Sequence, residues 1–287
     1  MIAWAAQKRI EEILLNLISK AVDSTGIKNV IFSGGIFLNM TMNMRINEKF
    51  GDKLKLFFNP ICADHGNAIG AALEYYYQQT GKNPIPSYMP LYLGSSYSDE
   101  EVLFSANRFN FKISKVNKID SAIDLIERGK VIGWFQGRSE FGPRGLGNRS
   151  ILSLPTEQKY KDIVNEKVKK RESWRPFCPT IIEEKSNEFL KNPTYAPYMI
   201  LGFEMKNPEL YTAVSHIDGT CRPQILRKEV NPDFYHVVKG LNGIVLNTSF
   251  NLAGDPIVET PHDALITLKN SEMDALLIND FLIEKCV

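Results

Sequence analysis

Short apolar runs alternate with segments of helical periodicity, and this alternation constrains the fold more than any other feature of the chain. Residues 29–32 form an apolar run that ends in a Ser-Gly-Gly turn, and residues 37–44 can then form a helix. Residues 54–58 form a second apolar run, and residues 68–77 again have helical spacing. A chain in which strands and helices alternate is predicted to be a mixed α/β protein.

The N-terminal segment and the second half of the chain follow the same pattern. Apolar residues at helical spacing occupy one face between residues 10 and 18, and Gly26 follows at the position of a helix cap. The elements expected in the second half are a helix over residues 121–128, a strand over 131–135, a helix over 159–171 and a strand over 243–246.

Residues 80–90 separate the two parts of the chain. They contain Gly81 and three prolines among polar residues, a composition that suits a linker better than a packed element. We therefore expect two domains, one over residues 1–85 and one over residues 86–287.

The composition is that of a globular protein, with 44% hydrophobic and 23% charged residues, and we expect the chain to be cytoplasmic. No run of about 18 apolar residues occurs, and the first residues lack the pattern of a secretory signal, so we expect no membrane segment. The cysteines form no CxxC pair, which argues against a disulfide framework and against a thiolate zinc site. They are Cys62, Cys178, Cys221 and Cys286.

Basic residues are concentrated in one segment. The formal net charge of the chain is +1, but residues 128–175 contain 12 Lys or Arg against 5 Asp or Glu. This segment therefore carries +7 and the rest of the chain −6, which indicates an anionic partner for the segment. For residues 167–171 alone, the alternative is a solvated helix face.

The loop over residues 137–150 is the most informative stretch. Its four glycines let backbone N–H groups approach a ligand closely, and Arg138, Arg144 and Arg149 can each form paired hydrogen bonds with phosphate or carboxylate oxygens. The loop therefore predicts an anion site. The alternative is that the glycines serve tight turns and the arginines pair with surface acids.

Polar residues at three other places are candidates for the same site. Asn165 and Lys169 are one helical turn apart, which would point both at one region and suit a polyphosphate. Arg222 lies beside a predicted turn, and Asn247 and Ser249 follow a predicted buried strand, where α/β proteins often bind ligands. Each signal taken alone is also explained by ordinary turn chemistry.

The chain contains four longer motifs: GRSEFGPRGLGNRSIL, VNEKVKKRESWRPFCPTI, HIDGTCRPQ and LNTSFNLAGDPIVETPHDAL. In this order they resemble the C-terminal domain of the O-carbamoyltransferases of antibiotic and nodulation-factor pathways. The resemblance covers nearly the whole chain, and such long motifs are far more specific than a single glycine fingerprint. It implies a partial actin-like (ASKHA-type) domain followed by a YrdC-like mixed α/β domain.

In that family the YrdC-like domain forms carbamoyladenylate from carbamoyl phosphate and ATP with Mg²⁺. The actin-like domain then transfers the carbamoyl group to a hydroxyl of a small-molecule acceptor. Attack on the α-phosphate needs concentrated positive charge, and the resemblance implies catalytic roles for Arg144, Lys169 and Arg222. The residues expected to bind the cofactor are Arg138, Arg149, Arg171, Asn247 and Ser249.

The N-terminal part resembles the second half of the transfer domain. The turn Ser33-Gly34-Gly35 matches a phosphate-facing turn there, and Asp64 falls where the family has a carboxylate ligand for a metal, thought to be Fe²⁺. An alternative for Asp64 is a cap of the helix that follows. The family's other ligands, a histidine pair and a further acid, are absent, so we expect the chain to need a missing N-terminal half, or self-association, for transfer.

The predicted function is therefore that of the C-terminal portion of a carbamoyltransferase. One alternative is threonylcarbamoyl chemistry on tRNA, although the chain lacks the overall basic balance of a tRNA-binding protein. Another is a non-catalytic remnant or subunit that binds nucleotide, which would leave the arginine-rich loop unexplained. We expect neither a membrane nor a nucleic-acid partner.

Overall fold

The computed structural model describes residues 1–83 and 91–286. Most of the linker predicted at residues 80–90 lies outside them. No helix among the described residues is long and apolar enough to cross a membrane. The chain divides into two compact units: the first comprises Met1–Met89 and Ile200–Gly202, and the second comprises Pro90–Met199 and Phe203–Val287.

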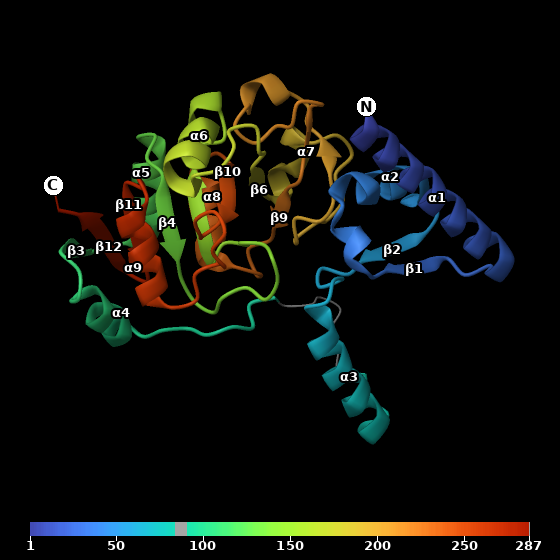
Figure 1. Cartoon of the computed structure of the whole chain (residues 1–287), viewed down its shortest axis with the longest axis horizontal. Helices are drawn as coiled ribbons and strands as arrows, with labels where there is room; N and C mark the ends of the chain where they lie inside the picture. The colour runs from blue at the N-terminus through green and yellow to red at the C-terminus, as the bar shows by residue number, and fades with distance from the viewer. Residues whose placement is uncertain (84–90, 287) are drawn as a thin grey trace. The chain divides into compact units, whose positions relative to one another are not determined.

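The first unit is built on a two-stranded parallel sheet. Strands β1 (Asn29–Phe32) and β2 (Lys55–Phe58) form at the two predicted apolar runs. They pair in parallel, and α2 (Met40–Phe50) makes the crossover between them (Figure 1). Helix α1 (Ile2–Thr25) ends at Gly26 in the left-handed conformation. The core contains Ile18, Phe32, Met42, Ile46, Phe50 and Leu54. The other elements are η1 (Gly35–Leu38) and α3 (Gly66–Thr80).

The second unit contains an eight-stranded sheet among its described residues, in the order β3-β12-β11-β4-β5-β10-β6-β9. Its neighbours are parallel in some pairs and antiparallel in others, which confirms the mixed α/β class. The strands are β3 (Phe111–Lys115), β4 (Ile132–Phe135), β5 (Arg149–Ser153), β6 (Cys178–Ile182), β9 (Gln224–Leu226), β10 (Ile244–Ser249), β11 (Ala275–Ile278) and β12 (Phe281–Lys285). A separate pair is formed by β7 (Phe203–Glu204) and β8 (Thr220–Cys221).

Helices α5 (Lys118–Glu127) and α8 (Pro232–Gly240) pack on the sheet of the second unit. Their apolar residues form one buried cluster with alternate strand residues, in which Trp134 of β4 lies beside Phe234 of α8. The other helices of this unit are α4 (Asp99–Ala106), α6 (Gln158–Asp162), η2 (Ile163–Lys169), η3 (Glu183–Lys185), α7 (Ser186–Phe189), η4 (Pro208–Leu210) and α9 (Pro261–Asn270).

Two elements differ from their predicted form. The helix expected over residues 159–171 is divided into α6 and a π-helix, η2, which ends with Lys170 in the left-handed region (φ 51°). The wider π turn is closed by the Lys170 N–H, which donates to the carbonyl of Asn165, five residues earlier. Strand β10 extends past residue 246 to Ser249, because it pairs with β5 as far as Ser249 and with β6 as far as Asn247.

Candidate functional site

A small cavity lies beside the second half of β10. This strand pairs with β5 on one side and β6 on the other, and Asn247 stands opposite Cys178 of β6. A Cβ added at Gly145 would come within 2.9 Å of Ser249 Cα, so only glycine lets the loop approach the strand so closely. The cavity measures about 100 Å³. Five predicted site residues line it: Arg144, Arg171, Arg222, Asn247 and Ser249.

The three arginines make this cavity cationic, since no Asp or Glu is among the described residues of its lining. Arg171 lies over the ring of Phe177 and donates from Nε to Asn165 Oδ1 at 2.7 Å. Burial, and then the charge of Arg175, lower the pKa of Arg171 to about 10. Arg222 donates from Nε and Nη2 to Cys178 Sγ at 3.3 and 3.2 Å. The guanidinium groups of Arg171 and Arg222 are thus held in place by neutral groups before any anion arrives.

Asn247 is fully buried, and its neighbours determine the orientation of its amide group. Its Nδ2 donates to the Gly145 carbonyl at 3.3 Å and to Thr180 Oγ1 at 2.9 Å. Gln224 Oε1 lies 3.4 Å away on the same side, and Gln224 Nε2 is itself fixed by donation to the Leu146 carbonyl. Because carbonyl oxygens can only accept, this network sets both amide orientations. Asn247 Oδ1 has no hydrogen-bond partner among the described residues.

Lys169 lies next to the cavity and is only 3% exposed. Its Nζ donates to the Ser249 carbonyl (2.5 Å), to Ser249 Oγ (3.2 Å) and to Asn251 Oδ1 (2.7 Å). Burial, followed by the charges of Arg171 and Arg175, lowers the pKa of Lys169 well below its ordinary value. Lys169 therefore holds the end of β10 and reaches the cavity through Ser249.

Asn165 does not point at the same groups as Lys169, contrary to the expectation from helical spacing. Its Nδ2 donates to the carbonyls of Ser173 and Arg175, and its Oδ1 accepts from Arg171. The reason is the π-helix, in which residues four apart no longer stack as they do in an α-helix. Asn165 orders the segment that follows η2 and holds Arg171 at the cavity.

The glycine-rich loop binds a carboxylate of its own chain. Glu140 Oε1 accepts from the backbone N–H groups of Leu146 (2.6 Å), Asn148 (2.8 Å) and Arg149 (3.3 Å). The Gly147 N–H donates to Ser150 Oγ at 3.0 Å. Burial raises the pKa of Glu140, although the hydrogen bonds and Arg149 act in the opposite direction. The prediction that backbone N–H groups of this loop cradle a ligand is therefore wrong for residues 146–149.

Two of the predicted ligand-binding arginines bind backbone carbonyls, and neither lines the cavity. Arg149 is fully buried, with its guanidinium 3.5 Å from the centre of the Phe135 ring. It donates to the carbonyls of Gln136 (2.7 Å) and Ser95 (3.0 Å), and burial lowers its pKa to about 10. Arg138 donates to the carbonyls of Gly94 (2.8 Å) and Leu93 (2.7 Å). Both arginines fasten the segment around residue 94 to the loop.

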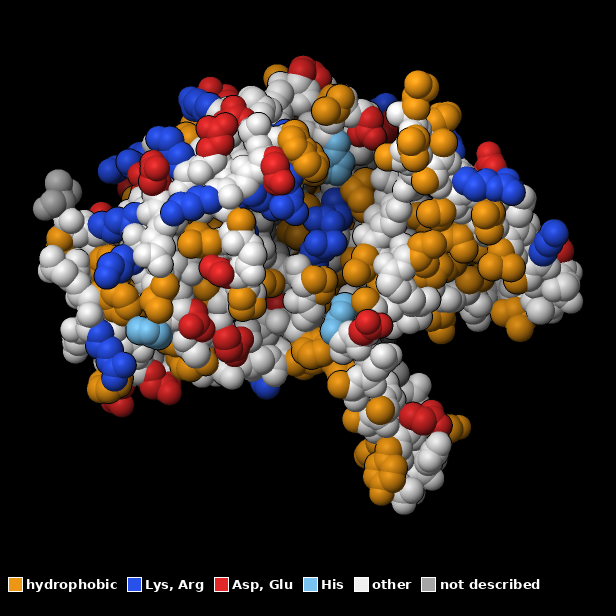
Figure 2. Space-filling model, in the orientation of Figure 1, with side chains coloured by type: hydrophobic (Ala, Val, Ile, Leu, Met, Phe, Trp, Pro, Cys, Tyr) orange, Lys and Arg blue, Asp and Glu red, His pale blue; other side chains and the backbone are white. Residues whose placement is uncertain are grey.

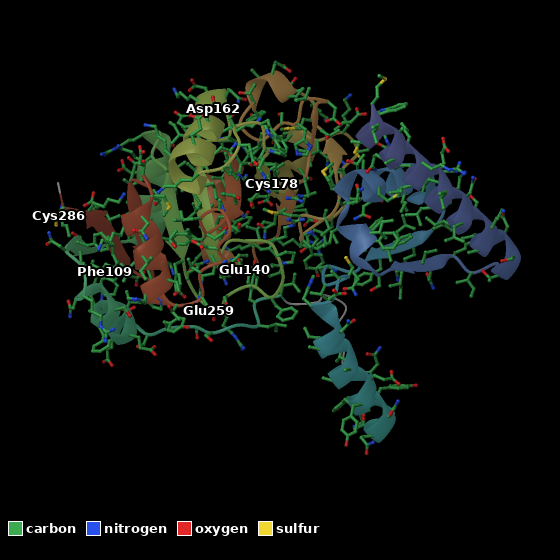
Figure 3. The ribbon with its side chains drawn as sticks, in the orientation of Figure 1. Phe109, Glu140, Asp162, Cys178, Glu259 and Cys286 are labelled. Atoms are coloured by element: carbon green, nitrogen blue, oxygen red, sulfur yellow. The ribbon has the colours of Figure 1, made fainter. Side chains whose placement is uncertain are left out.

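A larger hollow of about 450 Å³ adjoins the cavity and shares Pro143 and Ser249 with it. Its wall is acidic, since it includes Glu140, Asp255 and Glu259; Figure 3 labels the two glutamates. Burial would raise the pKa of Glu259, but hydrogen bonds from two serines keep it below its ordinary value. A cationic cavity and an acidic hollow therefore meet at Ser249.

The turn Ser33-Gly34-Gly35 of the first unit follows β1 and is exposed. Gly34 has a φ of 113°, a conformation that side chains other than glycine rarely adopt, and its N–H donates to the Cys62 carbonyl at 2.7 Å. The turn is therefore built around a glycine at this position, as its sequence indicated.

Asp64 lies in an exposed turn of the first unit, ahead of α3. The cap residue of α3 is His65, so the alternative that Asp64 caps this helix is wrong. No group of three or more His, Cys, Asp or Glu among the described residues could hold a metal ion. One carboxylate does not make an iron site, and the described residues on their own do not fit this metal.

The fold is that of a mixed α/β protein, and a small cavity lined by three arginines lies beside its central strand β10. The family model for the carbamoyltransferase C-terminus matches residues 123–285, and the model for the carbamoyltransferase N-terminus matches residues 2–73. The chain therefore belongs to the carbamoyltransferase family. All the cavity residues named above lie within the C-terminal match.

Nodulation protein NolO of Bradyrhizobium diazoefficiens is similar, with 34% identity over 99% of this chain and 54% of that protein. The 3'-hydroxymethylcephem-O-carbamoyltransferase of Amycolatopsis lactamdurans is 28% identical over 86% of this chain and 47% of that protein. The chain thus spans about half the length of the curated relatives it matches.

Two solved structures are similar to part of the chain. Full-length HypF in its phosphate- and nucleotide-bound form has a TM-score of 0.45 and 18% identity, covering 58% of this chain and 25% of that one. Sua5 of P. abyssi, complexed with L-threonine, has a TM-score of 0.42 and 12% identity, covering 60% of this chain and 49% of that one.

Several residues around the cavity lie within the sequence motifs but were not predicted to have a role in the site. Cys178 contacts Arg222, and Thr180 and Gln224 orient Asn247. Glu140 had a usable signal, because it is the only acid in a loop with three arginines and so suggests an internal partner. For Thr180 and Gln224 no local signal exists, since their role depends on the pairing of β6 with β9 and β10.

Proposed function

We propose that the second unit activates a carbamoyl group by forming carbamoyladenylate from carbamoyl phosphate and ATP. One observation carries this proposal: a single cavity combines three guanidinium groups with the buried, unpaired acceptor Asn247 Oδ1. Guanidinium groups bind phosphate oxygens in pairs, and a buried acceptor selects a ligand that supplies an N–H. Carbamoyl phosphate has a phosphate and an NH₂ group within a few atoms of each other, which suits a cavity of about 100 Å³.

We propose that ATP lies in the adjoining acidic hollow. Water takes the phosphoryl group of carbamoyl phosphate, which leaves carbamate and inorganic phosphate. A carbamate oxygen then attacks the α-phosphorus, and pyrophosphate leaves. Arg171 and Arg222 would stabilise the charge that develops, because neutral neighbours already hold them in place. Mg²⁺ bound with ATP would supply charge neutralisation, and the oxygen-rich wall around Asp255 and Glu259 suits such a cation.

We further propose that the carbamoyl group passes to a hydroxyl of a small-molecule acceptor. The N-terminal family match over residues 2–73 and a relative named as an O-carbamoyltransferase support this. In this proposal the first unit is one part of the transfer domain, Ser33, Gly34 and Gly35 face a phosphate, and Asp64 supplies one ligand. The remainder of the domain comes from an N-terminal half or a second copy.

The test is exchange of labelled pyrophosphate into ATP by the purified chain. Exchange should depend on carbamoyl phosphate and should not occur with acetyl phosphate, which has a methyl group where carbamoyl phosphate has NH₂. A site built around an N–H acceptor should discriminate at least about 100-fold between the two. Exchange driven by threonine and bicarbonate would favour the tRNA alternative. Complete inactivity without ATP binding would contradict an activating role.

We expect Asn247→Leu to abolish the preference for carbamoyl phosphate over acetyl phosphate. Leucine is close to asparagine in size but offers no acceptor, so the methyl group and the NH₂ group would then meet the same apolar surface. Competition binding of the two phosphates to the variant measures this. An unchanged preference would show that another group recognises the NH₂.

A further inference from the structure

Cys178 makes a contact with Arg222 that neither the motifs nor the proposed chemistry requires. Its Sγ accepts from Arg222 Nε and Nη2 at 3.3 and 3.2 Å, so a single sulfur atom occupies one whole side of the guanidinium. Cys178 is the first residue of β6, which is paired on both sides, with β10 and with β9. The sulfur is therefore a rigid point of attachment for a long and otherwise flexible side chain.

This contact leaves the outer end of the guanidinium available. Arg222 has five N–H donors, and the sulfur takes one from Nε and one from Nη2. The other three include the adjacent pair on Nη1 and Nη2 that binds two phosphate oxygens together. Arg222 lines the cavity, so an anion there can use this pair without displacing the sulfur.

A second observation places a ligand close to the sulfur. Asn247 stands directly opposite Cys178 in the β10–β6 pairing, and both line the same cavity. Asn247 Oδ1 is buried and has no hydrogen-bond partner among the described residues, so a ligand donor is expected at this point. Cys178 thus lies between the two groups, opposite Asn247 and in contact with Arg222, so a ligand that binds both would lie close to its sulfur.

We propose that Cys178 is a positioning residue that holds Arg222 for the phosphate of the ligand, and that the bound ligand covers its thiol. This inference rests on the proposed function, because it requires a phosphate in the cavity. A thiol reagent that modifies Cys178 would therefore block ligand binding, since the added group would fill much of a cavity of about 100 Å³.

The other cysteines provide internal controls. Cys62 and Cys221 are buried and do not line the cavity, and Cys286 is exposed. Cys286 follows β12, near the opposite edge of the sheet from β6 (Figure 3). Iodoacetamide reacts when the sulfur displaces iodide, forms a carbon–sulfur bond and loses its proton to solvent. Inorganic phosphate should slow this reaction at Cys178 and leave the rate at Cys286 unchanged.

Two variants of Cys178 test whether its role is to accept the hydrogen bonds of Arg222 or only to fill space. Cys178→Ser keeps an acceptor for Arg222, whereas Cys178→Ala removes it. By isothermal titration of the full chain with inorganic phosphate, we expect Cys178→Ser to bind within about threefold of the parent and Cys178→Ala to bind at least about tenfold more weakly. Alkylation should abolish phosphate binding by the parent but not by Cys178→Ser. This serine variant and the alkylation of the parent chain test the idea even if Cys178→Ala does not fold.

The outcomes distinguish this inference from the proposed function. If the parent chain binds neither inorganic phosphate nor carbamoyl phosphate, both are wrong. If the parent binds phosphate while folded Cys178→Ala binds equally well, or phosphate does not slow the alkylation of Cys178, the positioning role alone is wrong.

Discussion

The two units differ in how far their large apolar side chains are buried. In the second unit, Trp134 and Phe234 are almost completely buried between a helix and an eight-stranded sheet. In the first unit, Ile31 on β1 is 72% exposed, and further large apolar side chains of α1 and α3 reach the surface. Figure 2 shows these hydrophobic side chains gathered over α1 and along α3. Such a surface is typical of one that binds a partner.

The same contrast applies to the predicted sites. Around the cavity of the second unit, Arg171, Arg222 and Asn247 are each held by named hydrogen bonds. In the first unit, Gly34 and Asp64 lie in exposed turns. Strand β10 has a partner on both sides, whereas β1 and β2 pair only with each other among the described residues. Side chains are therefore held in place for binding where the strand that carries them is paired on both sides.

The largest effect should come from the core of the second unit. Phe234→Ala removes a fully buried ring and should lower the free energy of unfolding by about 3–5 kcal/mol. Ile31→Ala, in the first unit, should change it by no more than about 0.5 kcal/mol, because the side chain is mostly in solvent already. Urea unfolding of both variants measures the difference. Equal losses would contradict the contrast between the units.

The next effect concerns the network that orients Asn247. Gln224→Leu removes the acceptor beside Asn247 Nδ2 and should weaken binding of carbamoyl phosphate about 10-fold while changing the binding of acetyl phosphate less. The matched control is Gln136→Leu, a buried glutamine of the same unit that bonds Asn231 and does not line the cavity. Competition binding measures the ratio of the affinities for carbamoyl phosphate and acetyl phosphate in each variant. A similar loss of preference in the control would show that the effect is general destabilisation.

The third effect is a dependence of stability on pH. The pKa of Lys169 is lowered in the folded chain, so the unfolded chain binds more protons between that lowered pKa and the ordinary value of 10.5. The free energy of unfolding should therefore rise with pH in this interval, by up to about 1.4 kcal/mol per pH unit. Lys169→Met should lose this slope. Denaturant unfolding of both chains across the alkaline range tests it, and parallel profiles would show that Lys169 does not titrate differently on folding.

The smallest effect on stability is expected for charged substitutions on the exposed apolar surface of the first unit, which should instead change self-association of the chain. Leu17→Lys and Ile31→Lys place charges on exposed apolar positions of the first unit and should change stability by no more than about 0.5 kcal/mol. They should nevertheless reduce self-association of the chain, as measured by sedimentation velocity. Ile217→Lys, at a fully exposed apolar position of the second unit, is the control and should change nothing. A parent chain that stays monomeric at high concentration would remove the reason to regard this surface as a binding surface.

Much of the fold follows from local patterns in the sequence. The apolar runs predicted β1, β2, β4 and β10, and helical spacing predicted α1, because these periods depend on which face of an element is buried. Residue type also indicated the chemistry: Arg144, Arg171, Arg222, Asn247 and Ser249 were chosen from separate motifs, and the fold brings them to one cavity.

Only the tertiary structure decided which polar groups form hydrogen bonds with one another. The sequence shows that Arg149 and Arg222 can both bind phosphate, but Arg149 is enclosed by carbonyls while Arg222 reaches the cavity from Cys178. Lys169 meets Ser249, 80 residues away, because η2 and the end of β10 lie side by side. Local periodicity reports burial within one element, whereas a hydrogen bond between distant residues depends on how whole strands pair, and that pairing is set by the complete core.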